Sequence, residues 1–106
     1  MIEKELKALA HAGRLEILRD IISAGSDGIS SGLLAERHGL NFTTASAQLS
    51  VLTNAGLINS RREGRSIIYS PNDAVISRVL AYLILDVCQD RAQIMRPIAE
   101  MTGKEF

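Results

Sequence analysis

The sequence predicts a mainly α-helical fold with one small β-hairpin (α+β), in the element order α-α-α-α-β-β-α. Three observations lead to this fold class. Apolar residues recur at helical spacing in four segments before residue 56, two short β-prone runs follow within residues 57–70, and a long apolar segment covers residues 73–90. A length of 106 residues is typical of one domain, so we expect a single domain over residues 1–106.

Composition narrows the class of protein. Twelve basic and twelve acidic residues cancel, so only a local field on one face could favour a nucleic acid. The one cysteine, Cys88, excludes an intrachain disulfide and fits a reducing cytosol. No stretch approaches the roughly 20 apolar residues of a membrane span, and residues 1–10 lack a signal-peptide core. We therefore expect a cytoplasmic protein with no membrane partner.

The first two elements are predicted to be helices over residues 2–11 and 14–22, separated by Gly13. The apolar side of the first helix is expected to hold Ile2, Leu6, Leu9 and Ala10. Its charged side is expected to hold Glu3, Lys4, Glu5 and Lys7. In the second helix the residues expected to be exposed are Arg14, Glu16, Arg19 and Asp20.

The next pair of helices is joined by a short glycine-containing turn. Residues 23–28 form a turn by composition, Ile29 is a candidate for one extended residue, and Ser30 or Ser31 can cap a helix that Gly39 ends. Asn41 is a plausible N-cap for the helix after the turn. Two short helices around such a turn are typical of a helix-turn-helix. The alternative is an ordinary helical hairpin.

The segment from residue 42 to residue 70 decides between these alternatives. A helix is predicted over about 42–55, with Ala45, Leu49, Leu52 and Ala55 on one side and Gly56 just past its end. Two β-prone runs then form a hairpin over about 57–70, whose turn carries three arginines and a glycine, Gly64, where positive φ is needed. A polar helix beside a basic hairpin is the layout of a winged helix-turn-helix, with a recognition helix and a wing.

Candidate DNA contacts lie on this helix and wing. On the recognition helix they are Thr43, Thr44, Ser46, Ala47, Gln48 and Ser50; on the wing they are Arg61, Arg62 and Arg65. Gln48 can pair bidentately with adenine, Ala47 can contact a thymine methyl, and Ser50 suits a phosphate. The arginines suit the DNA backbone or the minor groove. The alternative for them is a solvated hairpin tip, with Arg61 turned toward the strand and Glu63 orienting an arginine.

The last predicted helix, over about 73–90, is apolar nearly all round, so one chain of this size cannot cover it. Pro71 closes the preceding strand, and Asn72 or Asp73 can cap the helix. We expect a homodimer through the terminal helices. Its expected interface residues are Leu6, Leu80, Leu83, Ile84 and Val87. Residues 89–106 could be a short helix or frayed.

In order and spacing, a set of short segments resembles the ArsR family of winged-helix repressors over nearly the whole chain. The segments are Ala8-Leu9-Ala10-His11, Arg14-Leu15-Glu16-Ile17-Leu18, Leu34-Ala35-Glu36, Ser46-Ala47-Gln48-Leu49-Ser50-Val51-Leu52, Ala55-Gly56-Leu57-Ile58, Arg61-Arg62-Glu63-Gly64-Arg65 and Ile68-Tyr69. The resemblance implies a homodimer that binds a palindromic operator and releases it when an effector binds.

The chain departs from the family at its effector sites. The metal-sensing Cys-x-Cys pattern is missing from residues 33–38, and residues 73–90 hold no histidine. Asp86-Val87-Cys88 matches part of an arsenic-sensing Asp-Cys-Cys motif, but no further cysteine follows. Cys88 is therefore either a sensor of a thiol-reactive or arsenic-type inducer or a small buried hydrophobe. We expect no metal site and no cofactor, with His11 and His38 at the surface or at helix ends.

The function expected from these observations is that of a homodimeric, DNA-binding transcriptional repressor whose partner is double-stranded operator DNA. Two alternatives stay open: a winged-helix protein-interaction module that has lost DNA binding, and a repressor without any effector. The neutral charge and Ala47 on the recognition face support the first of these. No catalytic constellation or phosphate loop is present in the sequence, so we do not expect an enzyme.

Overall fold

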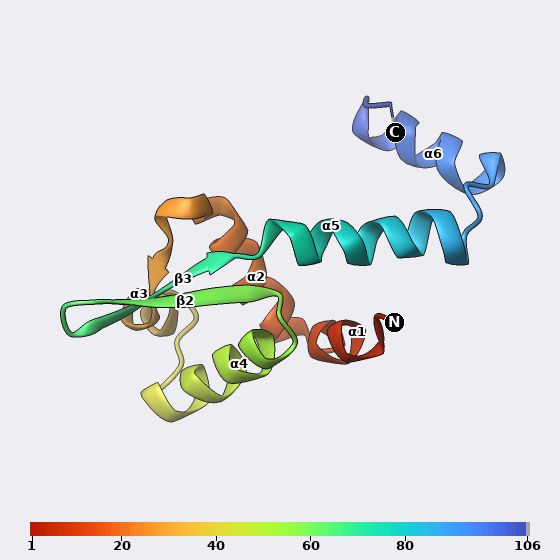
Figure 1. The fold of residues 1–106 in the computed structure, drawn as a ribbon. Helices are drawn as coiled ribbons and strands as arrows, with labels where there is room; N and C mark the ends of the chain where they lie inside the picture. The colour runs from red at the N-terminus through yellow and green to blue at the C-terminus, as the bar shows by residue number, and fades with distance from the viewer. Residues whose placement is uncertain (106) are drawn as a thin grey trace. The chain divides into compact units, whose positions relative to one another are not determined.

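A computed structural model describes residues 1–105, which divide into two compact units (Figure 1). The first unit spans Met1–Ile76 and the second begins at Ser77. The helices are α1 (Glu3–Leu9), α2 (Ala12–Ala24), the 3₁₀ turn η1 (Gly25–Asp27), α3 (Ser31–Arg37), α4 (Phe42–Asn54), α5 (Asp73–Ala81), the π-helical η2 (Tyr82–Val87) and α6 (Ala92–Thr102). The strands are β1 (Ile29–Ser30), β2 (Ile58–Glu63) and β3 (Ser66–Pro71). The predicted mainly α fold is confirmed, whereas the single domain over the whole chain stays a prediction.

The three strands form one antiparallel sheet in the order β1-β3-β2, with β3 in the centre. Glu63 pairs with Ser66 at the tip of the hairpin, and Gly64 supplies the positive φ of 61° that its tight turn needs. Figure 1 shows the β2–β3 hairpin reaching out from the helices of the first unit. The predicted element order lacked β1 and α6. A strand of two residues is too short to show an alternating pattern, so Ile29 alone marked it.

The core of the first unit lies between α2, α3, α4 and the base of the sheet. Its most completely buried large side chains are Ile17, Ile21, Leu34, Leu49, Leu52, Leu57 and Ile58. The predicted apolar side of the recognition helix is buried throughout, from Ala45 to Ala55. Burying a side chain such as Leu52 contributes about 1.5–3 kcal/mol. The core therefore holds one side of α4 and leaves its other side to solvent.

Side-chain caps mark the residues at which α3, α4 and α5 begin. Ser30 Oγ accepts from the Leu33 amide at 3.1 Å, and Asn41 Oδ1 accepts from the Thr44 amide at 2.8 Å. Asn72 Oδ1 accepts from the Val75 amide at 3.3 Å. Each satisfies an amide that has no partner inside its own helix, which contributes about 1 kcal/mol. The cap expected at Asn41 is thus present, and of the alternatives Ser30 or Ser31 and Asn72 or Asp73 the structure has Ser30 and Asn72.

The first two helices differ from the prediction in their break and in their buried face. The chain leaves the helix at Ala10 and His11, whose Nδ1 accepts from the Gly13 amide at 3.1 Å, so Gly13 lies inside α2. Glu5, expected on the charged side, is only 4% exposed, and Leu6 is 39% exposed. No buried side-chain nitrogen or oxygen within residues 1–105 lacks a hydrogen bond, which removes the main cost of burying a carboxylate.

In the second unit the expected long helix changes geometry before it ends. It is α-helical to Ala81 and π-helical over η2, with the Cys88 amide donating to the Leu83 carbonyl at 2.9 Å. Gln89 and Asp90 then adopt φ of 54° and 53°, which ends the helix. Of the tail at residues 89–106, which could be a short helix or frayed, Ala92–Thr102 form the helix α6, and residue 106 lies outside the described residues. No helix in the described part of the chain is long and apolar enough to cross a membrane.

Candidate nucleic-acid interface

The helices α3 and α4 pack against each other around a short turn, as in a helix-turn-helix. His38 ends α3, Gly39 follows with φ of 62°, and Asn41 starts the next helix. His38 Nε2 lies 2.8 Å from Oδ2 of Asp20 on α2, and both side chains are partly buried. Asp20, expected to be exposed, therefore ties the turn to the scaffold helix, while His38 lies at a helix end as expected.

One face of α4 is exposed, opposite the buried side that begins at Ala45. The candidate contacts with exposed side chains are Thr43, Thr44, Ala47 and Ser50, and those that are half-buried are Ser46 and Gln48. Their spacing of one, three and three residues places the exposed ones on a single side of the helix. Phe42, which the sequence reasoning did not single out, is 77% exposed in the first turn. The first two turns of α4 thus present hydroxyl, methyl and aromatic groups together.

Gln48 is joined to a residue that the sequence placed in solvent. Arg14 of α2 is half-buried, and its Nη1 donates to Gln48 Oε1 at 2.9 Å. Its Nε also donates to the Ala8 carbonyl in the last turn of α1 at 2.6 Å. Arg14 therefore links α1, α2 and α4. Its partners lie 6 and 34 residues away, so no local pattern could have indicated this link.

The three wing arginines differ in what they contact. Arg61 Nη2 lies 3.0 Å from Glu63 Oε2 and donates to the Asp27 carbonyl at 2.6 Å, and its Nη1 donates to the Ser26 carbonyl at 3.3 Å. Glu63 thus orients Arg61, which fastens β2 to η1. The side chains of Arg62 and Arg65 are exposed and make no hydrogen bond or ion pair within residues 1–105. The uncommitted positive charge of the wing therefore comes from Arg62 and Arg65.

The expected dimer contacts are partly exposed in the single chain. In the first unit Leu6 faces solvent from α1. In the second unit Leu80 and Val87 are 53% and 56% exposed, and Leu83 and Ile84 are half-buried. Burying these large apolar side chains against a second protein chain would be favourable. Their role in a dimer stays a prediction.

Cys88, the candidate sensor, is half-buried at the end of η2. It borders an open hollow of about 540 Å³ whose other lining residues are Val87, Gln89, Arg91 and Ile94. Cys88 is therefore not fully buried, and its role as a sensor stays a prediction. Within residues 1–105 no three His, Cys, Asp or Glu side chains lie close enough to hold a metal ion.

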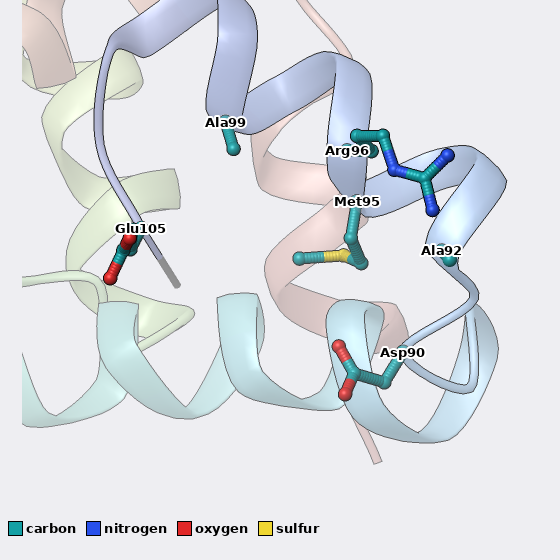
Figure 2. A pocket seen from close by; sticks show the side chains of 6 residues that line it. All are labelled: Asp90, Ala92, Met95, Arg96, Ala99 and Glu105. Atoms are coloured by element: carbon teal, nitrogen blue, oxygen red, sulfur yellow. The ribbon is translucent and has the colours of Figure 1, made fainter.

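A second hollow of the same unit, of about 400 Å³, is shown in Figure 2. Its lining residues are Asp90, Ala92, Met95, Arg96, Ala99 and Glu105. The Met95 thioether points into the hollow, whereas the Arg96 guanidinium points away from the Asp90 and Glu105 carboxylates (Figure 2). A site for a small molecule has polar groups that converge on one point. The polar groups of this hollow do not.

Comparison with known proteins identifies the family. No protein-family model matches the chain. It is 36% identical to YgaV, an HTH-type transcriptional regulator of Escherichia coli, over 78 residues that make up 74% of this chain and 77% of YgaV. The NMR structure of a homodimeric winged helix-turn-helix DNA-binding domain, Mb0332 of Mycobacterium bovis, a possible ArsR-family regulator, matches with a TM-score of 0.64 and 33% identity. That match covers 82% of this chain and 76% of the Mb0332 fragment. The chain belongs to the ArsR family.

As an ArsR-family member, this chain belongs to a family of DNA-binding transcriptional regulators of the winged helix-turn-helix class, which are not enzymes. The chain is also 33% identical to the HTH-type transcriptional regulator Rv0324 of Mycobacterium tuberculosis, over 92% of its own length. It spans only 42% of the length of Rv0324. What this chain shares with the family is the helix-turn-helix and the wing.

Proposed function

We propose that this ArsR-family protein is a homodimeric cytoplasmic repressor that binds a palindromic operator and releases it when an effector binds. One observation carries the proposal. A single exposed face of α4, from Thr43 to Ser50, accompanies a wing on which the side chains of Arg62 and Arg65 have no partner within the described residues. Specific DNA binding needs side chains that contact base edges in a groove and cations that contact the phosphates, and this helix and wing offer both.

The expected contacts follow from this division of chemistry. The first turns of α4 enter the major groove, where Thr43, Thr44 and Ser46 can bond base edges or phosphates. Ala47 can contact a thymine methyl, and Ser50 suits a phosphate. Arg62 and Arg65 bind the DNA backbone or the adjacent minor groove. Arg61 supports the wing through its hydrogen bonds to η1.

A homodimer fits both the exposed apolar residues and the operator. Leu6, Leu80 and Val87 would be buried against a second copy together with Leu83 and Ile84, and Mb0332, a relative, forms a homodimer. A two-fold dimer places two copies of α4 about 34 Å apart along the duplex, which requires a palindrome.

The experiment is a footprint on the DNA upstream of the protein's own gene, combined with sedimentation of the complex. Protection of two half-sites about one helical turn apart by a dimer is the expected result. Absence of protection at low salt would overturn the proposal. It would favour a protein-interaction module instead, which the exposed Phe42 and Ala47 on α4 also support.

For the effector we propose a thiol-reactive or arsenic-type compound that acts at Cys88, because Cys88 borders an open hollow and follows Asp86 by two residues. The alternative is an effector-independent repressor. Release of operator DNA by oxidants and trivalent arsenicals should occur in the wild type and be lost in Cys88→Ser. Equal responses of the two proteins would exclude Cys88 as the sensor.

A further inference from the structure

The side chain of Arg14 is held at two points on different helices. Its Nε donates to the Ala8 carbonyl at 2.6 Å, and its Nη1 donates to Gln48 Oε1 at 2.9 Å. The last carbonyls of an α-helix have no partner inside the helix, so the end of α1 provides a firm acceptor for the first bond. With one edge of the guanidinium fixed there, the other edge is fixed relative to Gln48.

The donor chemistry of arginine decides which way the Gln48 amide faces. A guanidinium has only N–H donors and no acceptor, so the amide atom beside it must be the oxygen. The amide is planar, so Nε2 then lies on the side away from the Arg14 hydrogen bond. Nε2 makes no hydrogen bond within residues 1–105. Gln48 is half-buried, so this end of its amide can still reach a ligand at the surface of α4.

We propose that Arg14 determines the base preference of Gln48, by holding Oε1 and leaving the Nε2 hydrogens to read the DNA. This inference rests on the proposed function, in which α4 enters the major groove. Arg14 itself is then a positioning residue, because it acts on DNA through the Gln48 amide.

The preference follows from what each base offers in the major groove. Guanine offers the two acceptors N7 and O6, thymine offers O4, and adenine offers the acceptor N7 beside its N6 donor, whereas cytosine offers only an N–H donor. Bidentate pairing with adenine needs Gln48 Oε1 to accept from the adenine N6 group. Oε1 has a second lone pair, but the positive hydrogens of the guanidinium repel those of the adenine N6 group, which leaves adenine only the single bond from Nε2 to N7. We therefore expect guanine or thymine opposite Gln48, which revises the adenine pairing expected from the sequence.

The test is selection of binding sites from DNA in which the operator half-site is randomised, with base frequencies compared between variants. The wild type should favour guanine or thymine over cytosine and adenine at one position, by about tenfold. Arg14→Met keeps an unbranched apolar stem but has no donor, so the amide can rotate. The preference at that position should fall severalfold and adenine should become acceptable, while other positions keep theirs.

A double-mutant design separates base reading from helix packing. Gln48→Ala should abolish the preference at the same position, and adding Arg14→Met to it should change nothing further there. Circular dichroism and thermal unfolding check that each variant is folded. A uniform loss of affinity in Arg14→Met, with an unchanged base profile, would mean that Arg14 only joins the helices and would overturn the inference.

Gln48→Glu gives a second reading if Arg14→Met does not fold. Glutamate keeps the bond to Arg14 but presents only acceptors, so the selected base should change to cytosine or adenine. An unchanged preference in this variant would also overturn the inference. If the wild type binds no DNA at low salt, the proposed function itself is wrong, and that result is distinct from binding with an unaltered profile.

Discussion

Replacing Arg62 and Arg65 by alanine should weaken the dependence of operator affinity on salt. Both side chains are exposed and have no partner within residues 1–105, so their removal costs no internal contact. Each phosphate that a cation neutralises contributes about 0.9 to the slope of log K against log salt. A two-fold dimer has two wings, so four arginine–phosphate contacts would contribute about 3.6. Over about a fourfold rise in salt, that slope corresponds to a difference of about 150-fold in affinity.

The assay is fluorescence anisotropy of a labelled operator across a salt series, for the wild type and for Arg62→Ala/Arg65→Ala. Arg19→Ala is the matched control, since it removes an exposed charge from α2 outside the proposed interface. The double variant should keep the wild-type unfolding temperature and show a slope lower by about 2–4. Equal slopes for the wild type and the double variant would refute the assignment of the wing to the DNA backbone.

Three further predictions concern stability. Gly28→Ala should lower the free energy of unfolding by at least about 1–3 kcal/mol, because φ is 81° and a Cβ would meet Ile68 and, at 2.9 Å, the Tyr69 carbonyl oxygen. Gly32→Ala, in open space on α3, should raise it by about 0.5–1 kcal/mol, and urea unfolding that ranks the two variants otherwise would contradict this. Asn41→Ala should cost about 1 kcal/mol in the same assay, whereas Asn41→Asp, which keeps an acceptor, should cost little. Burial raises the pKa of Tyr69, so stability should fall as the pH rises from about 10, where the unfolded chain ionises first, through the folded pKa. Tyr69→Phe should lack that part of the alkaline loss, and identical pH profiles would argue against it.

The recognition helix could be predicted from the sequence because its determinants are local. Asn41 caps the Thr44 amide three residues on, and Leu49 and Leu52 recur at the period of the helix. Gly56, with φ of 80°, marks the end of that helix. The same holds for the hairpin, whose turn depends on Gly64 and its neighbours.

The side-chain links of the candidate site could not be predicted in this way. Arg14 and Arg61 reach partners 34 and 35 residues away, and His38 reaches Asp20 across 18 residues. At the level of sequence each of these residues looks like an ordinary exposed charge or helix end. In α1 the expected burial of Ile2 is confirmed, but Glu5 and Leu6 were assigned wrongly. Seven residues make fewer than two full turns, so the choice between Glu5 and Leu6 depends on what the rest of the fold packs against them.

Each of these side-chain links joins the rest of the fold to one part of the candidate site. Arg14 joins the scaffold to α4, His38 and Asp20 join it to the turn, and Arg61 joins it to the wing. Each is a partly exposed polar contact that contributes about 0.5–1.5 kcal/mol, whereas truncating a buried residue such as Leu52 to alanine costs about 2–5 kcal/mol. The apolar core therefore determines whether the domain folds, and we expect the polar links to set the orientation of the parts proposed to contact DNA. Loss of one link should leave the fold intact and broaden the range of sequences that the protein binds.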